Sequence, residues 1–196
     1  MSTDPFAPIT SNPKYKTTAQ TTNLILKEDI NALTGGQVAA IKDKHTKKIL
    51  YTVGQPSSVF SGHRRMVKDN HGHLVGQLRR KKIPGLRPTY YLGTKDNEKH
   101  CAIVLKDLLD FQSRNADIYL NDEIIGEVVG KDWKVKNFEI KIKNKVVAKI
   151  CKTVDMSVRG FAHEDDYCMD ILSEGVDTAF IAMITIALDQ LYQDKM

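Results

Sequence analysis

Four segments of the chain alternate apolar and polar residues on either side of a short polar stretch. They are residues 41–53, 67–78, 118–129 and 140–150. A period of two is typical of a strand with one buried face, and Asn, Asp, Gly or Lys between two such runs indicates a tight turn. Each segment is therefore predicted to be a β-hairpin. The chain from Thr21 to about Asp170 is predicted to consist almost entirely of short antiparallel strands.

The second strand of three hairpins has a large, a small and a large residue on the face that we predict to be inward. These triplets are Leu74–Gly76–Leu78, Ile124–Gly126–Val128 and Val146–Ala148–Ile150. Because residues i, i+2 and i+4 of a strand share a face, the small residue leaves room for a bulky element close to the sheet. The first hairpin has Tyr51 at that position. The outward face is predicted to carry Gln77, Arg79, Glu127, Lys141, Lys143 and Lys149.

The most apolar stretch is TAFIAMITIAL, residues 178–188, in which Thr185 is the only polar residue after the first. Its apolar residues cover all sides of a helix, which indicates a helix enclosed by protein or by lipid. About ten to fourteen such residues span only ~15–21 Å, which is too short to cross a bilayer. Asp177 is a suitable N-cap, and Glu174 adds favourable negative charge before the helix.

Together these patterns predict a mainly β protein, a closed antiparallel β-barrel that encloses a hydrophobic C-terminal α-helix. A barrel of about ten to twelve strands leaves no open edges, and the helix fills its interior. The core-facing residues of the helix are predicted to be Phe180, Ile181, Ile184 and Leu188. Two alternatives remain open: the helix packs on the outside of a β-sandwich, or it is a tail anchor.

Residues 1–20 contain three of the six prolines and many Ser, Thr and Asn, so we expect a flexible lead-in before a single domain over 21–196. The N-terminus lacks the apolar segment of a secretory signal, and no run approaches the ~20 apolar residues of a membrane span. We expect a cytoplasmic protein, with peripheral association at the plasma membrane and a nuclear location as open alternatives. Cys101, Cys151 and Cys168 are expected to be buried free thiols in a reducing compartment.

Positive charge is concentrated between His63 and Tyr90, where eight Lys or Arg and one acid give 8 − 1 = +7, against +5 for the whole chain. The candidate lipid-binding residues are Arg64, Arg65, Arg79, Arg80, Lys81, Lys82 and Arg87. One hypothesis is binding of phosphoinositide or another anionic membrane surface. A second hypothesis is that these residues form a solvated outer face. A third, the weakest, is nucleic-acid binding. Alternation places Arg79 and Lys81 on one face of the strand and Arg80 and Lys82 on the other.

Motifs for catalysis are missing from the sequence. It has no Gly-rich phosphate loop, no nucleophile elbow and no zinc-protease motif. We therefore expect a non-enzymatic binding protein without catalytic residues, metal or cofactor. His71 and His73 flank a glycine in a predicted turn that offers no cysteine ligand, and residues 163–166 form an acidic loop without the spacing of an EF-hand.

Two segments carry a resemblance to a known family. DYCMDILSEGVDTAFIAMITIALDQL, residues 166–191, and DNHGHLVGQLRRKK, residues 69–82, resemble the LURP-one-related family of the tubby C-terminal-like superfamily, which also holds the phospholipid scramblases. The resemblance covers nearly the whole chain after residue 20. It implies a twelve-stranded barrel around a central hydrophobic C-terminal helix.

The resemblance also implies a class of function. Members of the family are tied to defence-related processes in plants, and some related proteins bind membrane phosphoinositides. It carries over no catalytic residue. The expected partner is an anionic membrane lipid, contacted by a monomer with a signalling or defence-related role. A protein–protein interaction scaffold and scramblase-like lipid handling are the alternatives.

Truncation tests the enclosed helix. Because the barrel cannot be filled without its last element, a chain ended after Asp177 is expected to lose cooperative folding rather than merely detach from a membrane. Chemical denaturation monitored by circular dichroism measures this. A truncated protein that stays soluble and unfolds cooperatively would show that the helix is not the core.

Overall fold

The computed structural model describes residues 4–10, 12–18, 21–28, 37–54, 64–81, 88–94, 100–106, 115–131, 137–154 and 165–193. These residues form a short 3-10 helix, twelve strands and one α-helix. The elements are η1 (Pro13–Tyr15), β1 (Thr22–Glu28), β2 (Gln37–Asp43), β3 (Ile49–Gly54), β4 (Arg64–Asp69), β5 (Leu74–Lys81), β6 (Thr89–Gly93), β7 (Cys101–Leu105), β8 (Ala116–Leu120), β9 (Glu123–Gly130), β10 (Asn137–Ile142), β11 (Lys145–Val154), β12 (Asp165–Ile171) and α1 (Thr178–Gln193).

The twelve strands form one closed antiparallel barrel. Each strand pairs with its neighbours in the sequence, and β1 pairs with β12 to close the ring. Closure matters because an open sheet would leave unpaired backbone groups at two edges. The mainly β fold and the closed barrel predicted from the alternation are therefore confirmed.

All four predicted hairpins are present: β2–β3, β4–β5, β8–β9 and β10–β11. Two of them turn on residues with positive φ at both positions, Asn121 and Asp122 in one, Lys143 and Asn144 in the other. Such turns twist in the same sense as the strands they join, and Asn and Asp adopt this conformation more easily than most residues. The polar residues between the apolar runs thus determine where the chain reverses.

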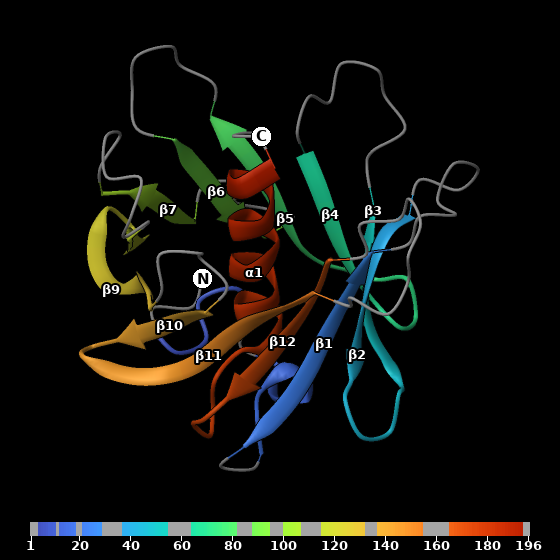
Figure 1. Cartoon of the computed structure of the whole chain (residues 1–196). Coiled ribbons are helices and arrows are strands. Elements are labelled where there is room, and N and C mark those ends of the chain that lie inside the picture. Colours follow the sequence, from blue (N-terminus) through green and yellow to red (C-terminus); the bar gives the residue numbers. More distant parts are fainter. Residues whose placement is uncertain are drawn as a thin grey trace.

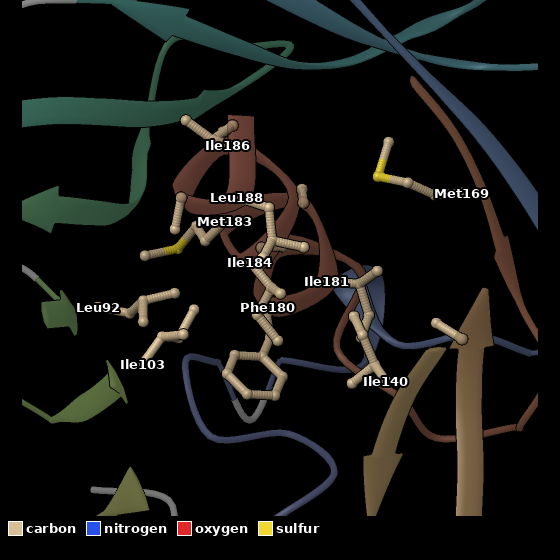
Figure 2. Packing of buried hydrophobic residues seen from close by; sticks show 14 of the residues in the cluster. Leu92, Ile103, Ile140, Met169, Phe180, Ile181, Met183, Ile184, Ile186 and Leu188 are labelled. Atoms are coloured by element: carbon tan, nitrogen blue, oxygen red, sulfur yellow. The ribbon is translucent and has the colours of Figure 1, made fainter. Parts of the chain in front are cut away.

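The helix α1 runs through the middle of the barrel (Figure 1). From Ala179 to Leu188 every side chain is at most 5 % exposed, and Thr185 satisfies its hydroxyl by donating to the carbonyl of Ile181 at 3.0 Å. Figure 2 shows Phe180, Met183 and Ile184 of the helix among wall residues such as Leu92 and Ile103. The enclosed helix is confirmed, and both alternatives, packing outside a sandwich and a tail anchor, are wrong.

The prediction that the three triplets face inward is only partly correct. Leu78, Val128 and Ile150 are buried, but Ile124 is 61 % exposed, and Leu74 and Val146 are half-buried. The reason is an irregularity in each hairpin, where the register shifts by one residue, as between Val67 and Lys68. A bulge of this kind moves the residues beyond it to the other face of the sheet.

The two glycines of the triplets have different roles. A Cβ on Gly76 would lie 2.6 Å from the Sδ atom of Met183, so its absence admits the helix, as predicted. A Cβ on Gly126 would instead collide with the backbone carbonyl of Lys141 on β10. Gly126 therefore allows two strands to approach each other and makes no room for the helix.

The described part of the N-terminal segment packs on the barrel at the start of α1. Ala7 and Ile9 are buried, and the backbone N–H of Asp177 donates to the carbonyl of Phe6 at 2.9 Å. Thr17 adds two backbone bonds, one to Val176 and one from Gly175. The composition predicts a flexible lead-in, but it does not reveal that three consecutive residues, 7–9, are buried.

The two glycines give a paired prediction. Gly76→Ala is expected to cost about 1 kcal/mol, because the flexible end of Met183 can move away from the added methyl group. Gly126→Ala is expected to cost about 3 kcal/mol or more, because the backbone of β10 cannot move without breaking the ladder. Urea denaturation measures both. Equal costs, or a larger cost for Gly76→Ala, would contradict the assigned contacts.

Candidate functional site

The register of β4, β5 and β6 sorts the predicted basic residues into two sets. Arg64 lies opposite Arg79, and Arg79 lies opposite Tyr91. The next row pairs Arg65 with Leu78, which is fully buried. Because cross-strand partners share a face, the first row lies on the outer wall and the second on the inner wall. The residues Arg64, Lys68, Arg79 and Lys81 lie on the outer wall, and we call them the β4–β5 basic face.

The guanidinium of Arg64 is held in place by a buried amide. Its Nε donates to Oε1 of Gln77 at 3.2 Å, and Nε2 of Gln77 donates to the carbonyl of Thr94 at 2.8 Å. Gln77 was predicted to be exposed, but it is 4 % exposed because Arg64 covers it. A buried amide with both ends bonded fixes the position of the cation above it.

The described strands around the β4–β5 basic face carry few acids. Among the residues of β3, β4, β5 and β6, all of which the structure describes, Asp69 is the only acid, and its side chain is 1 % exposed. Elsewhere lysines meet carboxylates: Lys106 lies 2.8 Å from Glu127, and Lys131 lies 2.7 Å from Glu139. The described residues of these four strands therefore place no exposed carboxylate beside the β4–β5 basic face.

The inward set lies toward the end of α1. Arg80 is opposite Tyr90, whose ring is buried. Burial raises the pKa of Tyr90 to about 12, while Arg80 and Arg65 act to lower it and Asp189 acts to raise it. Arg65 and Arg80 therefore lie close enough to the buried ring of Tyr90 to affect its pKa. Lys82 and Arg87 lie outside the described residues.

A polar contact joins that end of the helix to the wall. The hydroxyl of Tyr167 on β12 donates to Oδ1 of Asp189 at 2.8 Å, and both residues are buried. The ammonium group of Lys152 lies 5.4 Å from the centre of the Tyr167 ring.

The seven predicted lipid-binding residues do not form one patch: three lie on the outer wall, two face the interior and two are not described.

The other end of the helix is organised by Asp177, the predicted N-cap. Its Oδ1 accepts from the backbone N–H groups of Ala179 and Phe180 at 2.9 and 3.2 Å, and its Oδ2 accepts from Thr10 at 2.9 Å. Burial raises the pKa of Asp177 to about 6, although these backbone donors act to lower it. The carboxylate therefore joins the helix start to the N-terminal segment as well as capping the helix.

A second buried carboxylate, Asp69, binds the same segment. Its Oδ2 accepts from Nζ of Lys14 at 3.0 Å and from the hydroxyl of Tyr15 at 2.8 Å. Its Oδ1 accepts from the backbone N–H groups of His71 and His73, both at 2.9 Å. Burial acts to raise the pKa of Asp69, but these donors outweigh it and hold the pKa well below the usual range. This role of Asp69 was not predicted from the sequence, because Lys14 is fifty-five residues away.

The remaining candidates are less organised. His71 and His73 are exposed on the β4–β5 turn, and no group of three potential metal ligands occurs among the residues that the structure describes. Residues 163–166 were predicted to be an acidic loop, but Asp165 and Asp166 belong to β12, where Asp166 pairs with Lys27 at 2.9 Å, and residues 163 and 164 are not described. Of the three cysteines expected to be buried, only Cys101 is. Cys151 is exposed and Cys168 is half-buried, because both alternate with inward residues.

Asp69 gives a prediction with a matched control. Asp69→Asn is expected to lower the free energy of unfolding by about 1–2 kcal/mol at pH 7, because Lys14 and Tyr15 lose a charged acceptor. Asp43 occupies the same place in the β2–β3 hairpin and accepts from the backbone of His45 and Thr46 without contacting the N-terminal segment. Asp43→Asn is therefore expected to cost less.

The pH dependence follows from the sign of the shift. The pKa of Asp69 is lower in the folded state than in the unfolded chain, so its stabilisation is present near neutral pH and is lost on acidification below about pH 4. The difference between wild type and Asp69→Asn should shrink over that range in urea denaturation. A difference that does not change with pH, or equals that of Asp43→Asn, would contradict the assignment.

Two of three comparisons with known proteins found a match. A solved X-ray structure of a protein from Arabidopsis thaliana superposes with a TM-score of 0.64 over 95 % of this chain and 99 % of that one, at 17 % identity. Such a likeness supports the fold alone. No curated protein matches. No helix among the described residues is both long and apolar enough to span a membrane. The model of the LURP-one-related family matches residues 22–189, and the chain therefore belongs to the LURP-one-related family.

Proposed function

We propose that this protein is a non-enzymatic binding protein that associates with anionic phospholipid, such as phosphoinositide, through the β4–β5 basic face. The supporting observation is the arrangement of charge on two adjacent strands. Arg64, Lys68, Arg79 and Lys81 share the outer wall, and the four strands β3 to β6 contain no exposed acid. A lipid headgroup at this surface meets several cations at once, with no exposed carboxylate of these strands to repel it.

The strength of such contact is moderate. Each Lys or Arg close to an anionic membrane contributes about 1 kcal/mol, so four contribute about 4 kcal/mol, or roughly a thousandfold in the binding constant. Association of this strength is reversible and sensitive to ionic strength. It suits a protein that contacts a membrane surface without inserting into it.

The buried helix limits the alternatives. Scramblase-like handling that relied on the apolar segment would require its exposure, but Ala179 to Leu188 are enclosed by the barrel. The proposal of a signalling or defence-related role rests on the family resemblance. A scaffold that binds only other proteins is the alternative that the experiment below must distinguish.

The test is sedimentation with vesicles of phosphatidylcholine alone, or mixed with phosphatidylserine or with a phosphoinositide. Arg79→Ala with Lys81→Ala removes two exposed outer cations and leaves the inward Arg80 in place. The loss of about 2 kcal/mol predicts roughly thirtyfold weaker binding to the anionic vesicles. The chosen pair avoids Arg80, whose loss would alter the interior next to Tyr90.

The matched control is Lys145→Ala with Lys149→Ala, which removes the same charge from exposed positions on β11. Its binding to anionic vesicles is expected to change by less than about threefold, as for cations distant from the contact. Equal losses in both variants would mean that net charge alone drives binding. Failure of the wild type to sediment with either anionic vesicle at physiological salt would favour the scaffold.

A further inference from the structure

Two of the three cysteines face each other across adjacent strands. In the antiparallel pairing of β11 and β12, Cys151 is the direct partner of Cys168. The neighbouring pair, Ile150 and Met169, is buried at 1 % and 0 % exposure. Since alternate residues lie on opposite faces, both thiols lie on the outer wall of the barrel. The pairing of these two cysteines could not be predicted from their spacing in the sequence or from the composition.

The spacing of antiparallel strands suits a disulfide at this position. Directly opposed residues have Cα atoms about 4.5 or 5.5 Å apart, depending on their place in the hydrogen-bond ladder. Disulfides join cysteines whose Cα atoms are about 4.4–6.8 Å apart. Both cases fall within this range, so the bond requires no change of register between β11 and β12. Cys101, by contrast, is buried on β7, and burial raises its pKa to about 12.

We propose that Cys151 and Cys168 form a redox modification site, a dithiol that converts reversibly to a cross-strand disulfide by exchange with a small disulfide such as oxidised glutathione. The proposal is independent of lipid binding. In the strand order of the barrel, β11 and β12 are separated from β4 and β5 by several strands in either direction, so the two sites occupy different parts of the wall.

The exchange proceeds in two steps that balance. The exposed Cys151 loses its proton to solvent, and its thiolate attacks one sulfur of oxidised glutathione, forming a mixed disulfide and releasing one glutathione thiolate, which takes up a proton. Cys168 then loses its proton and attacks the sulfur of Cys151, expelling the second glutathione thiolate. Two protein thiols are oxidised by two electrons, and one glutathione disulfide is reduced to two glutathione thiols.

The surroundings of the two thiols indicate which of them reacts first. Cys151 is exposed and accessible to the oxidant, whereas Cys168 is half-buried between β1 and β11. Burial raises the pKa of Cys168, while the positive charge of Lys44 acts to lower it. A shielded thiol that meets a mixed disulfide directly opposite it reacts faster than a second glutathione can arrive, because the step is intramolecular. Cys151 is therefore the attacking thiol and Cys168 the resolving one.

The experiment uses the full-length protein equilibrated in a series of ratios of reduced to oxidised glutathione. Remaining thiols are alkylated, and intact and peptide mass spectrometry identify the products. The wild type is expected to lose two of its three thiols together, without bound glutathione, and to join the peptides that contain Cys151 and Cys168. Excess reduced glutathione should restore both thiols. Because this result needs no substitution, it does not depend on the folding of a variant.

Three variants complete the test. Cys101→Ala is the matched control and should still form the bond. Cys168→Ser should accumulate glutathione on Cys151, and Cys151→Ser should form no intramolecular bond. The proposal is overturned if the wild type keeps all three thiols throughout the series, if it accumulates glutathione adducts in place of the crosslink, or if Cys101→Ala fails to form the crosslink while remaining folded.

Discussion

Burial of the apolar helix α1 inside the barrel determines the architecture of this protein. The segment from Ala179 to Leu188 has no polar stripe, so each of its sides needs an apolar neighbour. A closed wall of strands supplies such neighbours in every direction, whereas a flat sheet covers only one side. The small residue Gly76 allows Met183 to lie close to β5, so the fit is set by shape as well as by hydrophobicity.

Enclosing a helix creates a second requirement at its ends. The first N–H groups and last carbonyls of a helix need partners, and inside a barrel water is scarce. Asp177 meets this need at the start of α1, and the N-terminal segment covers that end through Thr10 and Ile9. Near the other end the hydroxyl of Tyr167 donates to the side chain of Asp189, which joins the helix to the wall. The buried carboxylate of Asp177 is thus a consequence of the apolar core, since it completes the start of the helix that the core requires.

The alternation of residues along each strand also determines which polar side chains face outward and which face the interior. Consecutive residues of β5 lie on opposite faces of the sheet: Arg79 and Lys81 face outward, and Arg80 faces the interior beside Tyr90. The same rule puts Cys151 and Cys168 on the outer wall while Ile150 and Met169 fill the core. A run of basic residues in a strand therefore alternates between the outer wall and the interior. Substituting the whole run changes both faces at once, so a loss of binding cannot be distinguished from a loss of stability.

The hairpins and the apolar helix could be predicted from the sequence, because alternation, turn residues and the apolar TAFIAMITIAL stretch are local patterns. The closed barrel around the helix was the favoured of several arrangements, and the pairing of β1 with β12 confirms it. Which residues beyond a bulge face inward depends on the register between strands, since a one-residue shift that reverses the faces, as at Ile124, leaves no mark in the local pattern. The partners of Asp69 and the pairing of Cys151 with Cys168 likewise arise only in the folded chain. These contacts join residues from separate elements, and their distances depend on how the chain closes on itself.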